Sequence, residues 1–263
     1  KTILMKQVQV PTVDNTTTTT TERRRQTNTN FVTNVNNMNC LLLLIRWNDC
    51  KITLPDVNQY NTLINGDNYS VKDLYLVNSN GKFTLNGVVT PWITSNYSET
   101  TVAQNSCYGC TLHQAIYDIL DTIDNMYDLR IFDQNNDGWV DSIGIIHSGY
   151  GAEFNGDKIN HIWSHKWGFP KWTSKKTGIQ ITDYFITSGL WGTSGNEIAR
   201  IGTFSHEFGH YLGLPDLYDT DYDGRGLGKY SLMANSWGFD SSQKYPGMLD
   251  AWCREKLGWA YVI

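Results

Sequence analysis

The chain has 263 residues, enough for one large domain or for two subdomains that share a cleft. Hydrophobic residues make up 40% and charged residues 18%, a composition typical of a globular protein. The formal net charge of −5 argues against nucleic acid or an anionic membrane as the main partner. No apolar run approaches the ~18 residues of a membrane span. We therefore expect no nucleic-acid partner, no membrane span and a monomer.

The first 37 residues differ from the rest in composition. Six consecutive threonines (Thr16–Thr21) and three arginines (Arg23–Arg25) lie among scattered asparagines, with few apolar side chains to bury. Such a segment cannot offset the entropy of ordering, so we expect residues 1–37 to be a disordered tail, linker or pro-region. Residues 1–10 lack the apolar core of a signal peptide. The chain therefore looks like part of a longer precursor.

Apolar periodicity predicts an alternation of strands and helices from about residue 39 onward. The run Cys40–Ile45 indicates a buried strand, and the apolar positions of Thr111–Leu129 recur at helical spacing with one buried face. Strands mixed with two long helices favour an α/β architecture. The predicted helices cover 70–79, 111–129 and 198–212, and the predicted strands cover 40–45, 82–89, 140–147 and 180–187.

Five cysteines allow two interpretations. Cys107 and Cys110 form a CYGC motif before the long helix, and Cys40 and Cys50 flank the first strand. An oxidised protein would pair these four and leave Cys253 over. A thioredoxin-like redox site is the alternative, because a helix N-terminus lowers a thiol pKa. No βαβ pattern surrounds the motif, so we favour the structural interpretation.

The motif His206-Glu-Phe-Gly-His210 carries the strongest chemical signal. Its histidines are four residues apart, so on a helix both imidazoles project from one face. Glu207 lies between them, where it would reach a water on the metal, as the general base of a zinc hydrolase does. A random match is expected on the order of 0.003 times in such a chain. The motif therefore predicts a zinc site.

The third ligand should follow the helix. Gly213 can take a positive φ and Pro215 cannot continue a helix, so the chain must turn sharply. Asp216 then lies ten residues after His206, where metzincins of the pattern H-E-x-x-H-x-x-G-x-x-H place a third histidine. A carboxylate is also a zinc ligand. Met233 is the natural Met-turn, a hydrophobic floor beneath the two imidazoles.

These motifs resemble the immune-inhibitor-A-like secreted metallopeptidases, a metzincin branch. The resemblance extends from about Cys40 to Ile263. It implies a catalytic domain over 38–263, with an upper subdomain (about 38–213) of a mixed twisted sheet, a backing helix and an active-site helix. It also implies a smaller C-terminal subdomain (214–263) below the cleft, secretion and a propeptide. The segments that carry the resemblance are 70–75, 78–84, 137–141, 162–165, 202–219, 230–233 and 256–259.

We therefore expect a secreted zinc endopeptidase that acts on protein or peptide substrates. Zinc, held by His206, His210 and Asp216, would activate a water, and Glu207 would take its proton and deliver it to the leaving amine. An extended substrate would pair with an edge strand, which we expect near 180–187. Trp237 and Phe239 follow the Met-turn and are candidates for the pocket of the residue after the cleaved bond.

Two acidic loops are candidate calcium sites. The first has oxygens at calcium-loop positions 1, 3, 5 and 9, but Gly144 stands where an EF-hand has its glutamate, so an Asx-rich turn is the alternative. The second, D-x-D-x-D-G, follows the third zinc ligand, and its alternative is a solvated acidic loop. The candidate ligands are Asp133, Asn135, Asp137 and Asp141 in the first loop, and Asp219, Asp221 and Asp223 in the second.

Other functions account for less of the sequence. His161 and His165 could form a second metal site, although structural imidazoles are the more common case. A catalytically idle adhesion or matrix-binding module with structural zinc and calcium would leave Glu207 without a role, because a structural zinc has four protein ligands. A redox protein built on CYGC would leave the zinc motif unexplained.

Overall fold

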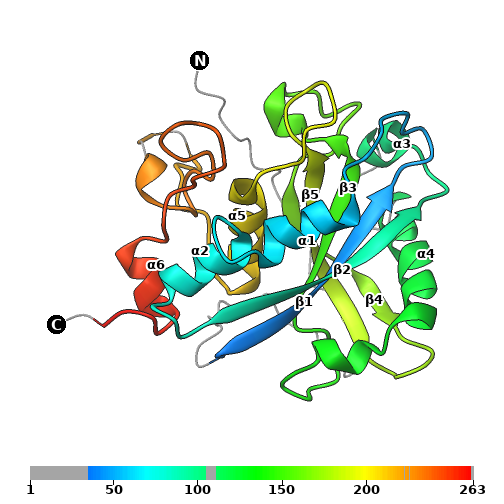
Figure 1. Cartoon of the computed structure of the whole chain (residues 1–263), viewed down its shortest axis with the longest axis horizontal. Coiled ribbons are helices and arrows are strands. Elements are labelled where there is room, and N and C mark those ends of the chain that lie inside the picture. The colour runs from blue at the N-terminus through cyan, green and yellow to red at the C-terminus, as the bar shows by residue number, and fades with distance from the viewer. Residues whose placement is uncertain (1–34, 105–110, 222, 225, 262–263) are drawn as a thin grey trace, which may run out of the picture.

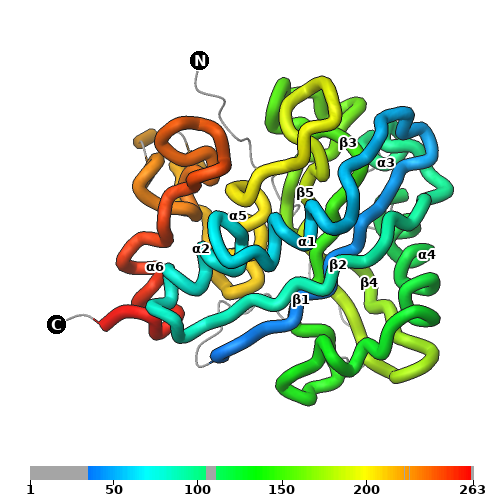
Figure 2. Tube along the Cα trace, in the orientation of Figure 1, coloured from blue at the N-terminus to red at the C-terminus, as the bar shows by residue number. Residues whose placement is uncertain are grey.

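The computed structural model describes residues 35–104, 111–221, 223–224 and 226–261. Its centre is a five-stranded sheet in the order β2-β1-β3-β5-β4 (Figures 1 and 2). Four strands are parallel, and β4 is antiparallel to β5 at one edge. The strands are β1 (Asn37–Arg46), β2 (Thr84–Thr94), β3 (Ile143–Tyr150), β4 (His165–Thr173) and β5 (Gln180–Leu190).

Helices cover both faces of this sheet. On β5, Tyr184 contacts His113 of α4, whereas its neighbour Phe185 contacts Phe204 and Tyr211 of α5. Adjacent strand residues point to opposite faces, so α4 and α5 lie on opposite sides. Figure 1 shows α1 and α2 on the same side as α5. The helices are α1 (Val57–Asn65), α2 (Val71–Asn78), α3 (Glu99–Gln104), α4 (Thr111–Met126), α5 (Ile201–Tyr211) and α6 (Ala251–Lys256), with 3₁₀ turns η1 (Leu129–Phe132), η2 (Ala152–Phe154) and η3 (Gly228–Tyr230).

The apolar run of the sequence forms the centre of the sheet. The side chains of Cys40–Ile45 are fully buried in β1, which lies between β2 and β3. A parallel strand covered on both faces needs a continuous apolar run rather than alternation. The predicted α/β architecture is confirmed, and so are its strands and long helices, with shifts of a few residues at their ends.

The prediction of the edge strand is wrong. The segment 180–187 belongs to β5, which pairs with β3 on one side and with β4 on the other. The free edge on this side of the sheet belongs to β4. Periodicity locates a strand in the sequence, but the order of strands in the sheet depends on how the loops cross.

The prediction that Cys40 and Cys50 form disulfides is also wrong, since both are free thiols. Cys40 is buried in β1, where Ser142 donates its hydroxyl to the sulfur at 3.2 Å. Burial raises the pKa of Cys40 to about 12, so it behaves as a small apolar side chain. Cys253 is likewise buried and free. Cys107 and Cys110, like residues 1–34 of the predicted tail, lie outside the described residues.

The C-terminal segment packs against α2 and the start of β2. Trp259 contacts the rings of Tyr75 and Phe83, and the Leu249 amide donates to the buried side chain of Asn78 at 2.8 Å. Residues 214–261 contain only η3, α6 and loops among the described positions, and their division into a lower subdomain stays a prediction. No helix in the described part of the chain is long and apolar enough to cross a membrane.

Candidate active site

Helix α5 carries the HExxH motif and is buried almost all round. On one side Phe204 and Tyr211 pack on Phe185 of the sheet, and on the other the Tyr75 hydroxyl of α2 donates to the Ser205 carbonyl at 2.6 Å. A Cβ on Gly209 would lie 2.5 Å from the sulfur of Met233, so this glycine leaves room for the methionine side chain against the helix. These contacts fix the helix and the face that carries its histidines.

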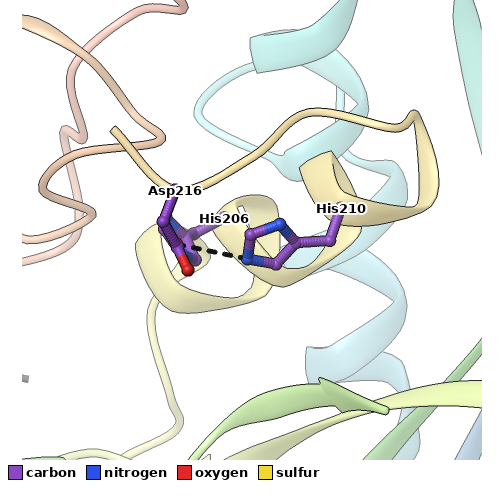
Figure 3. A group of neighbouring side chains, drawn as sticks. All are labelled: His206, His210 and Asp216. Atoms are coloured by element: carbon purple, nitrogen blue, oxygen red, sulfur yellow. Dashed lines mark ion pairs between the residues drawn. The ribbon is translucent and has the colours of Figure 1, made fainter. Parts of the chain in front are cut away.

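The chain leaves α5 by the sharp turn that the sequence predicts. Gly213 has a φ of 88°, and the Leu214 amide returns to the Gly209 carbonyl at 3.1 Å. This turn brings Asp216 back over the helix, as Figure 3 shows. Its Oδ1 lies 3.0 Å from Nε2 of His206 and 3.4 Å from Nε2 of His210. Tyr218 donates its hydroxyl to the other carboxylate oxygen at 2.9 Å.

The backbone decides which nitrogen of each imidazole carries a proton. Nδ1 of His206 lies 3.0 Å from the Leu232 carbonyl, and Nδ1 of His210 lies 2.8 Å from the Leu214 carbonyl. A carbonyl only accepts, so each Nδ1 carries a proton, and in the neutral ring each Nε2 presents its lone pair. Oδ1 of Asp216 is buried without a hydrogen-bond donor. With both rings neutral, two lone pairs and a carboxylate oxygen face one another, an arrangement that suits a cation.

Burial and charge shape the titration of this site. Burial raises the pKa of the Glu207 carboxyl above its usual range, and the backbone of Lys166 on β4 hydrogen-bonds to it. Burial opposes a charge on His206, but the Asp216 carboxylate outweighs it and raises the His206 pKa to about 9. Burial alone would raise the pKa of Asp216, but the two imidazoles hold it well below its usual range.

The structure adds Glu153, which sequence analysis missed, to the surroundings of Glu207. Glu153 is buried, and its carboxylate accepts the Ser164 hydroxyl at 2.7 Å. Burial raises the pKa of Glu153, and the charge of Glu207 raises it further. A single glutamate on a short 3₁₀ turn has no periodicity or motif, so only the tertiary structure reveals its position.

The loop after α5 contains the remaining predicted residues. Met233 is fully buried, and its sulfur lies against Gly209 of α5. Trp237 contacts Phe154 edge to face and packs at a tilt against Trp191. Phe239 is 62% exposed and contacts the ring of Tyr230 instead. The structure therefore does not bring the two predicted pocket residues, Trp237 and Phe239, into one aromatic cluster.

The two acidic loops differ. Carboxylates of Asp219, Asp221 and Asp223 each offer an oxygen within 4.8 Å of the others. In the first loop the polar side chains instead accept from the loop's own amides, as when Asp133 binds the Asp137 and Gly138 amides at 3.0 Å. Similarly, Asp141 accepts the Gln134 amide, and Asn135 accepts the Asp137 amide. Among the described residues the first loop forms no metal-type cluster, which favours the Asx-rich turn.

His161 and His165 do not come together as a metal site. His161 pairs through Nδ1 with Glu99 at 3.1 Å, whereas His165 lies between the Trp163 carbonyl and the Tyr184 hydroxyl. Each ring has its own partners. The interpretation of both as structural imidazoles agrees with these contacts.

Comparison with known proteins identifies the family. Residues 109–261 match the family described as immune inhibitor A peptidase M6, catalytic domain. The chain belongs to this family. The matched part of the peptidase M6 domain includes α5, Asp216 and Met233, and members of this class hydrolyse peptide bonds.

Two curated relatives support the assignment. Immune inhibitor A of Bacillus thuringiensis subsp. alesti is 32% identical over 185 residues, which cover 59% of this chain and 26% of that protein. The pre-pro-metalloprotease PrtV of Vibrio cholerae serotype O1 is 26% identical over 222 residues, 73% of this chain and 24% of that protein. The chain therefore spans about a quarter of the length of these relatives.

Proposed function

We propose that this peptidase M6 domain is a zinc-dependent endopeptidase whose metal is held by His206, His210 and Asp216. The observation that carries the proposal is the convergence of Nε2 of His206, Nε2 of His210 and a buried carboxylate oxygen of Asp216, with each Nδ1 bonded to a backbone carbonyl. Two imidazoles and one carboxylate leave a coordination position open, as catalytic zinc sites do. The name of the metalloprotease relative agrees with a metal at this position.

Zinc in this site would supply Lewis-acid chemistry, polarising the scissile carbonyl and acidifying the attacking water. The chain's own residues supply the rest. The carboxylate of Glu207 takes the proton of the attacking water and then delivers it to the leaving amine. Burial raises the pKa of Glu207, which strengthens it as a base. The Leu232 and Leu214 carbonyls keep both imidazoles in the neutral tautomer that a metal requires.

The substrate would bind as an extended peptide along β4. This strand is the free edge of the sheet next to the site, and its Lys166 backbone already hydrogen-bonds to Glu207. An edge strand offers unpaired backbone groups to a peptide of any sequence. Trp237, with Phe154 and Trp191, is the aromatic wall that we assign to the substrate pocket.

Secretion and calcium complete the proposal. The relative named a pre-pro-metalloprotease is made as a precursor, and we infer the same of the longer protein to which this chain belongs. Calcium is assigned to the cluster of Asp219, Asp221 and Asp223, because a divalent cation would relieve the repulsion of three adjacent carboxylates. We expect the domain to act as a monomer on protein or peptide substrates.

The test is cleavage of casein by the purified protein, together with a metal assay. Wild type should contain about one zinc per chain and lose cleavage in 1,10-phenanthroline. Glu207→Gln should keep the zinc and the fold but lose cleavage at least ~10²–10⁴-fold, because only proton transfer is removed. Near wild-type cleavage by Glu207→Gln would show that another group is the base. Cleavage that survives complete zinc removal would exclude the metal mechanism.

A further inference from the structure

The N-terminus of α5 is capped by a side chain from 40 residues further along the chain. Arg200, at the N-cap, makes no capping bond with its side chain. Instead the Gln243 carbonyl accepts the Gly202 amide at 3.0 Å, and Gln243 Oε1 accepts the Thr203 amide at 3.1 Å and its hydroxyl at 2.7 Å. Gln243 is only 2% exposed and has a left-handed φ of 58°.

This bonding fixes the orientation of the Gln243 amide. The backbone N–H of Thr203 can only donate, so the oxygen of the side-chain amide must face it. Nε2 and its two hydrogens therefore face away from the helix end. Nε2 is buried and has no partner.

A second unpaired donor belongs to a residue that lines the same small cavity as Gln243. Nε of Arg200 is buried without a partner, while the rest of its guanidinium binds Glu197 and the Ile198 carbonyl. Arg200 and Gln243 both line a cavity of about 10 Å³ whose walls are largely apolar. Its apolar wall includes Phe154, Trp191 and Phe204.

The cavity suits an anion better than a neutral guest. Buried N–H groups almost always find an acceptor, so two unpaired donors in one cavity call for a guest that accepts. No carboxylate lines the cavity among the described residues. The first turn of α5 contributes the positive end of the helix dipole, and Arg200 adds a positive charge that Glu197 offsets in part. The volume admits one atom-sized guest and not a peptide carboxylate.

We propose that this cavity binds a single halide-sized anion, such as chloride, on Gln243 Nε2 and Arg200 Nε. The anion would reinforce the N-terminus of the helix that presents His206, Glu207 and His210. Thr203, which Gln243 caps, lies one turn before His206. Stability of the active-site helix would thus depend on chloride, independently of the metal.

The location of the anion is tested by bromide. Crystals of the zinc-loaded protein soaked in sodium bromide should give an anomalous peak within hydrogen-bond distance of Gln243 Nε2 and Arg200 Nε. A water-like density without an anomalous signal in this cavity would overturn the proposal.

Thermal unfolding tests the energetics at constant ionic strength, with gluconate replacing chloride. The unfolding midpoint of wild type should rise with chloride, by about 3–6 °C at ten times the Kd. Formate in place of chloride tests whether a carboxylate also binds, and we expect it not to raise the unfolding midpoint. Equal midpoints in chloride and gluconate, or an equal effect of formate, would contradict a halide site.

Two variants assign the effect to these residues. Gln243→Glu keeps an oxygen for Thr203 but replaces the donor with a second oxygen, and Arg200→Lys keeps the charge but removes Nε. Both should lose the chloride dependence, whereas Arg130→Lys, an exposed arginine paired with Asp128, should keep it. Chloride dependence that persists in both variants would place the anion elsewhere. None of these measurements needs peptide cleavage, so their failure would leave the proposed function untouched.

Discussion

At the scale of single residues, the site depends on backbone carbonyls that hold the protons of its histidines. The Leu232 carbonyl comes from the loop containing Met233, and the Leu214 carbonyl from the turn after α5. Because each occupies Nδ1, each Nε2 is left as a ligand atom. The turn that returns Asp216, the proposed third ligand, therefore also orients a histidine.

Asp216 is predicted to be the third ligand. Asp216→Ala should lower zinc affinity by at least ~10–100-fold, whereas Asp216→His should keep the metal, because histidine is the commoner metzincin ligand. Competition with a fluorescent zinc chelator measures the zinc affinity of both variants. The control is Tyr218→Phe, which removes only the hydroxyl bonded to Asp216 Oδ2 and should cost less. Wild-type affinity in Asp216→Ala would direct the search to Asp219.

His147 predicts a pH effect on stability. Burial, together with smaller effects of the nearby His161 and His165, lowers the pKa of His147 to about 3, and the Glu99 carboxylate lies 3.8 Å from Nδ1. The neutral ring is favoured in the folded state, so this stability is complete above pH ~6.5 and is lost as the pH falls towards 3. The free energy of unfolding should fall by up to about 1.4 kcal/mol per pH unit from this group.

His147→Gln should therefore flatten the acid limb of the stability curve, measured by urea unfolding between about pH 6.5 and 4. His161→Gln is the control, because Glu99 raises the pKa of His161 and its contribution has the opposite sign. An unchanged slope in His147→Gln would show that carboxylates alone cause the loss of stability in acid.

At the scale of elements, α5 makes close contacts through a glycine near each end, with a side chain at one end and with backbone at the other. Gly209 admits Met233 near its C-terminus, and Gly202 admits the loop that contains Ser236 at its N-terminus. A Cβ on Gly202 would overlap the Ser236 carbonyl oxygen. Glycine weakens a helix, so its presence at this position reflects packing rather than helix propensity.

Gly202→Ala should destabilise the protein by about 1–3 kcal/mol, although alanine is favoured over glycine in a helix by about 1 kcal/mol. Urea unfolding of wild type and Gly202→Ala measures whether the free energy of unfolding falls or rises. Gly168→Ala is the matched control, since its Cβ would meet only the Thr182 carbonyl oxygen at 3.4 Å. A Gly202→Ala protein as stable as wild type would mean that the loop can move away without cost.

At the scale of the whole molecule, the acidic loop and the proposed zinc site are joined by a short segment. Asp219 lies three residues after Asp216, and the Leu217 amide between them donates to the Met233 carbonyl at 2.9 Å. Contact with Asp219 raises the pKa of Asp221, a sign that the carboxylates repel one another. A cation that drew them together would restrain Asp216 as well.

Calcium should therefore slow zinc loss. Zinc release to 1,10-phenanthroline, which takes up zinc and leaves calcium, is followed with and without calcium. Wild type should retain zinc longer in calcium, and Asp221→Ala should lose this difference. Asp67→Ala, an exposed aspartate outside the cluster, should behave as wild type. Equal zinc release by wild type with and without calcium would show that the loop is only acidic.

Local pattern in the sequence was sufficient to predict several elements of this protein. The buried run of β1, the amphipathic α4 and the HExxH helix follow from periodicity, and Gly213 with Pro215 dictates the turn that returns Asp216. The spacing of the two histidines on one helix and the turn that follows it are both local properties. The three candidate ligands therefore follow from the order of residues alone.

Tertiary packing determines which strand forms the edge of the sheet and what surrounds the site. Strand order follows from loop crossings, which leave no periodic trace, so β4 rather than β5 is the edge. Free thiols at Cys40 and Cys50 depend on their separate surroundings in space. The local pattern does not specify three further contacts. They are the hydrogen bonds from the two imidazoles to backbone carbonyls, the position of Glu153 near Glu207, and the Gln243 side chain at the N-terminus of α5. Such contacts form because packing brings distant backbones and side chains together, and no periodicity in the sequence encodes them.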